Sequence, residues 1–183
     1  EEKIVKEINR LANNSPLTKI SKEQIQPHPS LVQEQKDALQ ALSEYSLLFL
    51  VGGPGTGKTF TAGQMIKTIW EALKGKVEIA LAAPTGKAAA QLQSSLQKAL
   101  SGIDNGPKVQ AKTLHNLLGI KGKGSARKTT LSADFVLVDE SSMIDAEVMG
   151  TLLESIKPGA RLIFLGDPNQ LPPVESGGVF GDL

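Results

Sequence analysis

The sequence predicts a three-layer α/β fold, in which helices cover both faces of a mainly parallel sheet. Two observations lead to this prediction. Short segments that are apolar at consecutive positions alternate with longer segments whose apolar residues recur at helical spacing. Consecutive apolar positions are typical of strands that are buried on both faces. Strands that alternate with helices form crossover units, and these units build a parallel sheet.

The chain begins with a predicted helix and a connector. Apolar residues recur at helical spacing over residues 4–12, and the polar segment that follows contains three prolines before Ser30. We expect this segment to be a surface linker. The chain therefore divides into an N-terminal helix and linker, residues 1–30, and one domain, residues 31–183.

The same patterns predict the remaining elements. Helices are expected at residues 31–44, 58–73, 85–100, 113–118 and 146–156, and strands at residues 47–51, 77–82, 135–138 and 161–165. Residues 101–112 and the glycine-rich, basic segment 119–132 are expected to form loops.

Composition excludes several classes of site. The net charge is +1, from 20 basic and 19 acidic residues, so the composition lacks the basic excess that is typical of a nucleic-acid-binding protein. The chain contains no cysteine, which excludes disulfides, zinc–thiolate sites and catalytic thiols and fits a reducing cytoplasm. The longest apolar run, residues 47–51, is far shorter than a membrane span, so no membrane partner is expected.

A glycine-rich segment follows the first predicted strand and precedes a predicted helix. It consists of Gly52, Gly53, Pro54, Gly55, Thr56, Gly57, Lys58 and Thr59, with Phe60 next in the helix. Glycines at these positions let backbone N–H groups surround phosphate oxygens, and the helix directs its positive dipole end toward the same anion. We expect Lys58 to reach the β- and γ-phosphates and the Thr59 hydroxyl to bind Mg²⁺. The segment predicts an ATP site; the alternative is a glycine-rich turn with a chance lysine.

Two acids follow the predicted strand at residues 135–138. Ligands of open α/β sheets bind at the carboxyl ends of the strands, which is where Asp139 and Glu140 are expected to lie. Asp139 is expected to hold Mg²⁺, and Glu140 to act as the general base on the attacking water. The alternative is that the segment from Asp139 to Ser142 caps the next helix.

Four further segments make a family resemblance specific. Residues 83–90 look like helicase motif Ia, residues 113–119 like the motif Ib region, residues 139–145 like motif II, and residues 166–174 like motif III. With the glycine-rich loop, five segments stand in the correct order. Over about residues 31–183 the sequence resembles the RecD-type DNA helicases of superfamily one, the family of the exodeoxyribonuclease V α subunit.

The resemblance implies roles for single residues. Gln35 matches the glutamine that reads the adenine edge, Asp167 matches the acid of motif III, and Gln170 matches the glutamine that senses the γ-phosphate. Five residues match positions near single-stranded DNA: Thr85, Lys87, Thr113, His115 and Asn116. Alternatives stay open, because Gln35 could be a solvated helix residue, Thr85 a helix cap and His115 a half-buried structural histidine. The basic segment 121–128 could grip phosphates or simply be solvated.

The resemblance also implies a function. It indicates the first RecA-like motor domain of an ATP-driven helicase that moves 5′ to 3′ in double-strand-break repair and recombination. Single-stranded DNA and RecB- and RecC-type subunits are the implied partners. The family's second RecA-like domain, which supplies an arginine to the ATP, does not follow within these residues. We therefore expect the chain to belong to a longer protein, and by itself to bind nucleotide weakly and hydrolyse it slowly or not at all.

Three other functions remain open. The chain could be a nucleotide-gated interaction module of a multi-subunit complex, part of a stand-alone RecD-like helicase, or a P-loop phosphotransferase. The acid pair Asp139 and Glu140 suits water as the nucleophile, which favours hydrolysis over phosphotransfer.

Overall fold

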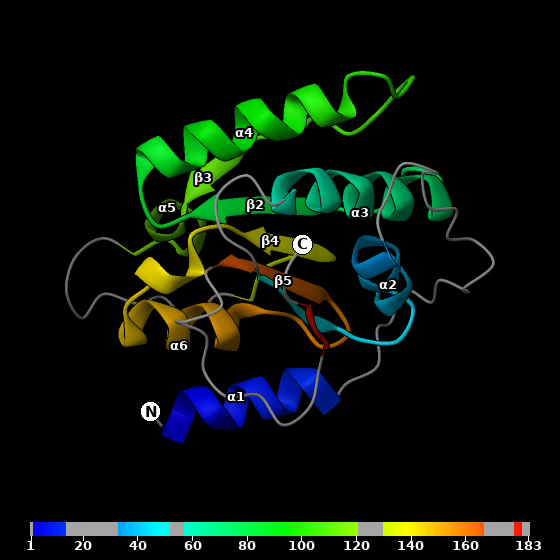
Figure 1. Cartoon of the computed structure of the whole chain (residues 1–183). Helices are drawn as coiled ribbons and strands as arrows, with labels where there is room; N and C mark the ends of the chain where they lie inside the picture. Colours follow the sequence, from blue (N-terminus) through cyan, green and yellow to red (C-terminus); the bar gives the residue numbers. More distant parts are fainter. Residues whose placement is uncertain (1, 14–32, 52–56, 121–129, 167–177, 181–183) are drawn as a thin grey trace.

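A six-stranded sheet forms the centre of the molecule (Figure 1). The computed structural model describes residues 2–13, 33–51, 57–120, 130–166 and 178–180. The strands are β1 (Leu47–Val51), β2 (Ile79–Ala83), β3 (Ala111–Thr113), β4 (Phe135–Val138), β5 (Arg161–Gly166) and β6 (Gly178–Phe180). Their order across the sheet is β3-β2-β4-β5-β1-β6, and all five neighbouring pairs are parallel. Strand β5 therefore separates β1, which precedes the glycine-rich segment, from β4, which precedes the acids.

Helices cover both faces of this sheet. They are α1 (Glu2–Asn13), α2 (Gln33–Ala41), α3 (Lys58–Ala72), α4 (Gly86–Leu100), α5 (Leu114–Leu118) and α6 (Ala146–Ser155). One hydrophobic cluster joins α2, α3 and α4 to one face, and a second joins α1, α5 and α6 to the other. The predicted three-layer α/β fold with a mainly parallel sheet is confirmed.

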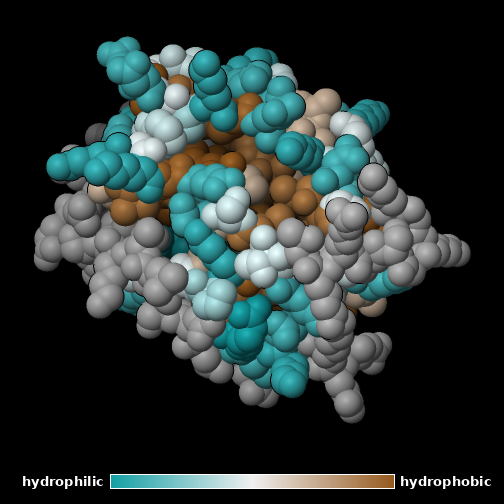
Figure 2. All heavy atoms as spheres, turned by 180° about the vertical axis from the view of Figure 1, so that it is seen from behind, coloured by the Kyte–Doolittle hydropathy of each residue, from teal (hydrophilic) through white to brown (hydrophobic). Residues whose placement is uncertain are grey.

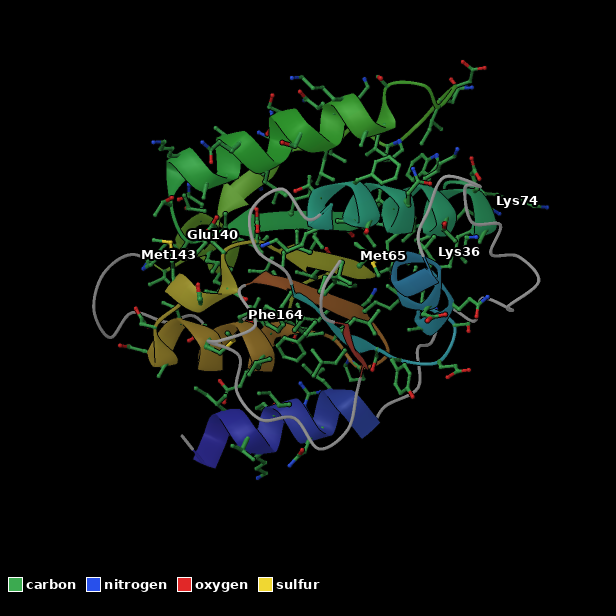
Figure 3. The ribbon with its side chains drawn as sticks, in the orientation of Figure 1. Lys36, Met65, Lys74, Glu140, Met143 and Phe164 are labelled. Carbon is green, nitrogen blue, oxygen red and sulfur yellow. The ribbon has the colours of Figure 1, made fainter. Side chains whose placement is uncertain are left out.

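The alternation of side chains along β1 explains why its sequence is apolar throughout. Leu48 and Leu50 belong to the first cluster, whereas Leu47 and Phe49 belong to the second. The Phe49 ring stacks on Phe164 of β5 with 5.2 Å between ring centroids. In Figure 3, Phe164 lies on the side of the sheet that faces α1 and α6. Figure 2 shows the molecule from behind, where hydrophobic side chains gather in the middle of the view and hydrophilic ones lie around them.

Helix α1 is packed against the rest of the fold. Its residue Leu11 is fully buried in the second cluster, where α1 lies against α6. The hydroxyl of Ser46 donates a hydrogen bond to the Leu11 carbonyl, which ties the end of α1 to the start of β1. The division between residues 1–30 and 31–183 stays a prediction. Within the described part of the chain, no helix combines the length and the apolar character that crossing a bilayer requires.

Two strands were absent from the sequence prediction. Strand β3 lies inside the predicted loop 101–112 and extends to Thr113, and β6 follows at Gly178–Phe180. Both stand at the outer edges of the sheet. Each has three residues, and the β3 segment Ala111-Lys112-Thr113 is half-exposed and partly polar. Edge strands of this kind lack the continuous apolar run by which buried strands are found.

A buried arginine joins α2 to the sheet. Arg161, at the start of β5, is 1% exposed, and its Nε donates to the Leu42 carbonyl at 2.9 Å. Burial lowers the pKa of its guanidinium to about 10. The group is therefore still charged at neutral pH, and it fixes the chain just after α2 against the sheet.

Helices α3 and α4 approach closely at Gly63. A Cβ atom at Gly63 would stand 2.8 Å from the Ala99 Cβ, which cannot move without its helix. We expect Gly63→Ala to destabilise the fold by about 1–3 kcal/mol through overpacking. Gly150→Ala is the matched control, since Gly150 lies in α6 with no neighbour within 4 Å of a built Cβ. It should stabilise by up to about 1 kcal/mol through helix propensity. Urea unfolding measures the change in unfolding free energy of each variant. A change of the same sign in both variants would contradict the packing argument.

A polar network closes the amino-terminal ends of β2 and β4. Asp134 Oδ2 accepts from the Glu78 N–H at 3.0 Å, and Asp134 Oδ1 accepts from Lys157 Nζ at 2.6 Å. The Ser132 hydroxyl donates to Glu78 Oε1. Burial acts to raise the pKa of Asp134, but the Glu78 hydrogen bond and the Lys157 charge outweigh it, so that the pKa lies below its ordinary value.

This lowered pKa predicts a pH-dependent stability. A carboxyl whose pKa is lower in the fold stabilises it above the unfolded pKa of 3.8, and that contribution is lost as pH falls through the folded value. We expect Asp134→Asn to cost about 1 kcal/mol of unfolding free energy at pH 7. The cost should shrink as pH falls below 3.8. Urea titrations at several pH values measure this loss of unfolding free energy. The control is Asp104→Asn, at an exposed position. A loss that does not depend on pH would contradict the role of the ionised carboxylate.

Candidate nucleotide site

The first turn of α3 presents Lys58 and Thr59 at the carboxyl edge of the sheet. Gly57, the residue before the helix, has φ 86° and ψ 14°, a left-handed conformation that favours glycine. The Gly57 carbonyl accepts from the Thr61 N–H at 2.9 Å and from the Thr61 hydroxyl at 3.0 Å. The helix thus begins directly at Lys58, and its free N–H groups and positive dipole end lie at this edge.

The two acids lie where β4 ends. The Asp139 N–H donates to the Ala82 carbonyl of β2 at 3.0 Å, which fixes Asp139 to the edge of the sheet. The Glu140 N–H donates to Asp139 Oδ1 at 2.8 Å, and the Glu140 carbonyl accepts from the Met143 N–H at 2.9 Å. Figure 3 shows Glu140 and Met143 at the end of the sheet from which α4 starts.

Glu140 has an unusual backbone. Its φ of 54° and ψ of 42° place it in the left-handed region, which costs a residue other than glycine about 1 kcal/mol or more. The hydrogen bond to Asp139 and the short helix η2 (Ser141–Met143) hold this conformation. It leaves the Glu140 side chain exposed at the sheet edge.

The alternative that these acids cap the next helix is wrong. Helix α6 is capped by Asp145, whose Oδ1 accepts from the Val148 N–H at 2.8 Å. Helix η2, which follows Glu140 directly, has no side-chain cap. Neither Asp139 nor Glu140 therefore caps the start of a helix with its side chain.

Thr59 and Asp139 line the same pocket. Its volume is about 360 Å³, and its other lining residues come from α4. Burial raises the pKa of Asp139, the charge of Glu140 raises it further, and the Glu140 N–H and the charge of Lys58 oppose this. A desolvated carboxylate beside a second acid is stabilised by a cation. The pocket thus combines a hydroxyl and a carboxylate, both oxygen ligands that Mg²⁺ accepts.

The donor set fits a metal that is shared with a phosphate. Among the described residues, no group of three or more acids and histidines is placed to hold a metal ion. Mg²⁺ commonly takes one or two protein oxygens and completes its shell with phosphate oxygens and water. The residues present fit this mode of binding.

Two of the candidate DNA residues, Thr113 and Asn116, line a second, larger pocket. Strands β2 and β3 pair Ala83 with Thr113, so motif Ia and the motif Ib region leave the sheet side by side. A pocket of about 590 Å³ is lined by Gly86 of α4 and by Thr113 and Asn116. Thr85, Lys87 and His115 are exposed nearby in the chain.

Two of the alternatives for these residues can be decided. Thr85 caps α4, since its Oγ1 accepts from the Ala88 N–H at 3.1 Å. Thr113 caps α5 in the same way, accepting from the Asn116 N–H at 3.2 Å. The alternative of a half-buried His115 is wrong, because its side chain is exposed.

Other predicted site residues lie outside the described residues. These are Gly52, Gly53, Pro54, Gly55, Thr56, Asp167 and Gln170, together with the basic segment 121–128. Gln35 lies in α2, but its side chain is outside the described part. Phe60 follows Thr59 in α3 and is 43% exposed.

Sequence reasoning missed the contribution of α4 to the smaller pocket. Gln91, Ser94 and Ser95 line it together with the buried Leu92. Exposed polar residues on an amphipathic helix are typical of a solvated surface, so their spacing carried no signal.

Comparison with known proteins decides the family. Residues 35–176 match a family model described as an AAA domain. The chain belongs to the AAA domain family.

Two curated proteins are similar to this chain over most of its length. The RecBCD enzyme subunit RecD of Mycolicibacterium smegmatis is 42% identical over 165 residues, covering 82% of this chain and 30% of that protein. The ATP-dependent RecD2 DNA helicase of Deinococcus radiodurans is 38% identical over 149 residues, covering 80% of this chain and 19% of that protein. The resemblance to RecD-type proteins is confirmed, and the chain spans less than a third of the length of these relatives.

A solved structure shares the fold. The Pif1 helicase of Bacteroides in complex with ADP-AlF4 superposes with a TM-score of 0.52 at 24% identity, over 81% of this chain and 35% of that one. This likeness, with the family match, confirms a RecA-like P-loop fold.

Proposed function

We propose that this chain is the first motor domain of an ATP-driven, RecD-type DNA helicase. The observation that carries the proposal is the shared pocket of Thr59 and Asp139. Lys58 is near enough for its charge to act on the pKa of Asp139. A lysine, a hydroxyl and a desolvated carboxylate at a helix N-terminus suit a triphosphate with a divalent cation.

In this proposal each residue has one task. The backbone of residues 52–60 surrounds the phosphates, and Lys58 contacts the β- and γ-phosphates. Thr59 and Asp139 hold Mg²⁺, which when bound neutralises phosphate charge. Glu140 orients the attacking water and accepts its proton. The family resemblance adds Gln35 at the adenine, with Asp167 and Gln170 at the γ-phosphate.

The proposed DNA track crosses the edge formed by motif Ia and the motif Ib region. The candidate residues lie at the end of β3 or just after the adjacent strands β2 and β3: Thr85, Lys87, Thr113, His115 and Asn116. Exposure of Lys87 and His115 supports contact with a phosphate backbone. Capping does not exclude such contact, since the N–H groups of a capped helix start still attract phosphate.

The finer assignment is to the α subunit of exodeoxyribonuclease V, acting with RecB- and RecC-type subunits. The relative named as a RecBCD subunit supports it. The similarity to RecD2 supports the alternative of a stand-alone helicase. In both cases a second motor domain must close the ATP site, so we propose that the isolated chain hydrolyses ATP slowly or not at all.

Binding of single-stranded DNA tests the proposal. Fluorescence anisotropy with a labelled oligonucleotide should show affinity that falls with salt. Lys87→Ala should weaken binding and reduce the magnitude of the slope of log K against log salt by about 1. Lys98→Ala, at the other end of α4, should leave it unchanged. Nucleotide binding without any DNA binding would contradict the motor and favour the nucleotide-gated interaction module.

A further inference from the structure

Helix α4 extends beyond the start of α3. Figure 1 shows its first turns projecting past the residues with which α3 begins. The close approach of Gly63 to Ala99 sets how the two helices lie against each other. Because α4 starts further out than α3, the middle of α4 rather than its first turn faces Thr59. The second and third turns of α4 therefore form a wall of the pocket that Thr59 and Asp139 share.

Gln91 is the polar side chain on this wall with the greatest reach. Leu92 belongs to the buried core, and Ser94 and Ser95 carry short hydroxyls. The Gln91 amide offers both an acceptor oxygen and an N–H donor. Gln93, two residues further along, serves a different purpose, since its Oε1 accepts from the Ala111 N–H at 2.9 Å and closes the edge of β3.

We propose that Gln91 is a positioning residue for the metal–nucleotide complex, with its amide oxygen accepting a hydrogen bond from a water of the hydrated divalent cation. The residues from outside α4 that share the pocket with Gln91 are Thr59 and Asp139, the two candidate metal ligands, which favours the cation over the phosphates. Mg²⁺ keeps several of its waters when it binds a protein and a phosphate, and these waters need acceptors. The inference rests on the proposed function of this site.

The test measures binding and needs no turnover. A fluorescent, non-hydrolysable ATP analogue is titrated into the 183-residue chain at increasing Mg²⁺, and separately in EDTA. Loss of an outer-shell partner of a metal typically costs tenfold or more in metal affinity. Mg²⁺ should increase the affinity for the analogue, and we expect Gln91→Ala to raise the Mg²⁺ concentration that gives half of this increase about tenfold. The affinity for the analogue in EDTA should be unchanged. Gln91→Glu, which keeps an acceptor, should stay within about threefold of wild type, since the acceptor is the atom that matters.

Gln97→Ala is the matched control. Gln97 lies on the same helix and lines the larger pocket instead, so its loss should leave the Mg²⁺ requirement unchanged. A normal Mg²⁺ requirement in Gln91→Ala, a tenfold rise in Gln91→Glu, or an equal shift in Gln97→Ala would each overturn the inference. If Mg²⁺ does not increase the affinity of the wild type for the analogue, or if the wild type binds no analogue, the proposed nucleotide site itself is wrong. These two failures are thus distinguishable.

Discussion

Replacing Lys58 by alanine is expected to abolish ATP-driven unwinding in a protein that joins this chain to a second motor domain. Lys58 is the first residue of α3 and lies near enough to Asp139 for its charge to act on that carboxyl, and it is the proposed contact to the β- and γ-phosphates. Removing one charged contact to a developing charge typically costs a factor of at least about a hundred in rate, or about 2.7 kcal/mol. Steady-state ATPase and strand-separation assays measure the loss.

Lys67→Ala provides the matched control for Lys58→Ala. Lys67 lies further along the same helix and lines a different pocket, away from Asp139. It should unwind DNA at the wild-type rate. Unwinding by Lys58→Ala at the wild-type rate would rule out the assigned role of Lys58.

In the same two-domain protein, Glu140→Gln should separate nucleotide binding from hydrolysis. The amide keeps the size of the side chain and leaves the backbone hydrogen bonds to Asp139 and Met143 in place. It cannot accept the proton of the attacking water, and loss of a general base costs about 10²–10⁴ in rate. ATP should therefore stay bound and uncleaved, which a single-turnover assay with radiolabelled ATP and counting of trapped nucleotide would show.

The control for Glu140→Gln is Glu147→Gln, in the exposed first turn of α6. It makes the same change of side chain at a position outside the proposed site, and both binding and hydrolysis should be normal. Hydrolysis by Glu140→Gln within threefold of wild type would assign the base to another residue.

The sequence was most informative where burial and function both constrain it. The buried strands β1, β4 and β5 show continuous apolar runs, and each leads into a predicted motif. The edge strand β3 was missed because only its pairing to β2 makes it a strand. Its identity depends on residues distant in the chain, and no local pattern carries that information.

The sequence predicts some residues of the candidate site and misses others. A P-loop and an acid pair imply a common edge of a parallel sheet, and Thr59 and Asp139 do line one pocket. The contribution of Gln91 could not be predicted, because it depends on how far α4 projects past α3. That projection follows from helix packing at Gly63 and Ala99, which a single sequence does not reveal.

One double-mutant cycle tests the central claim that α3 and β4 converge on one magnesium-bound nucleotide. Thr59→Val, Asp139→Asn and the double variant are compared for the Mg²⁺-dependent gain in affinity for a non-hydrolysable ATP analogue. Residues that hold one ion act together, so each single change should remove most of the gain and the double change little more. Fully additive losses, or an unchanged gain in Asp139→Asn, would contradict the shared site.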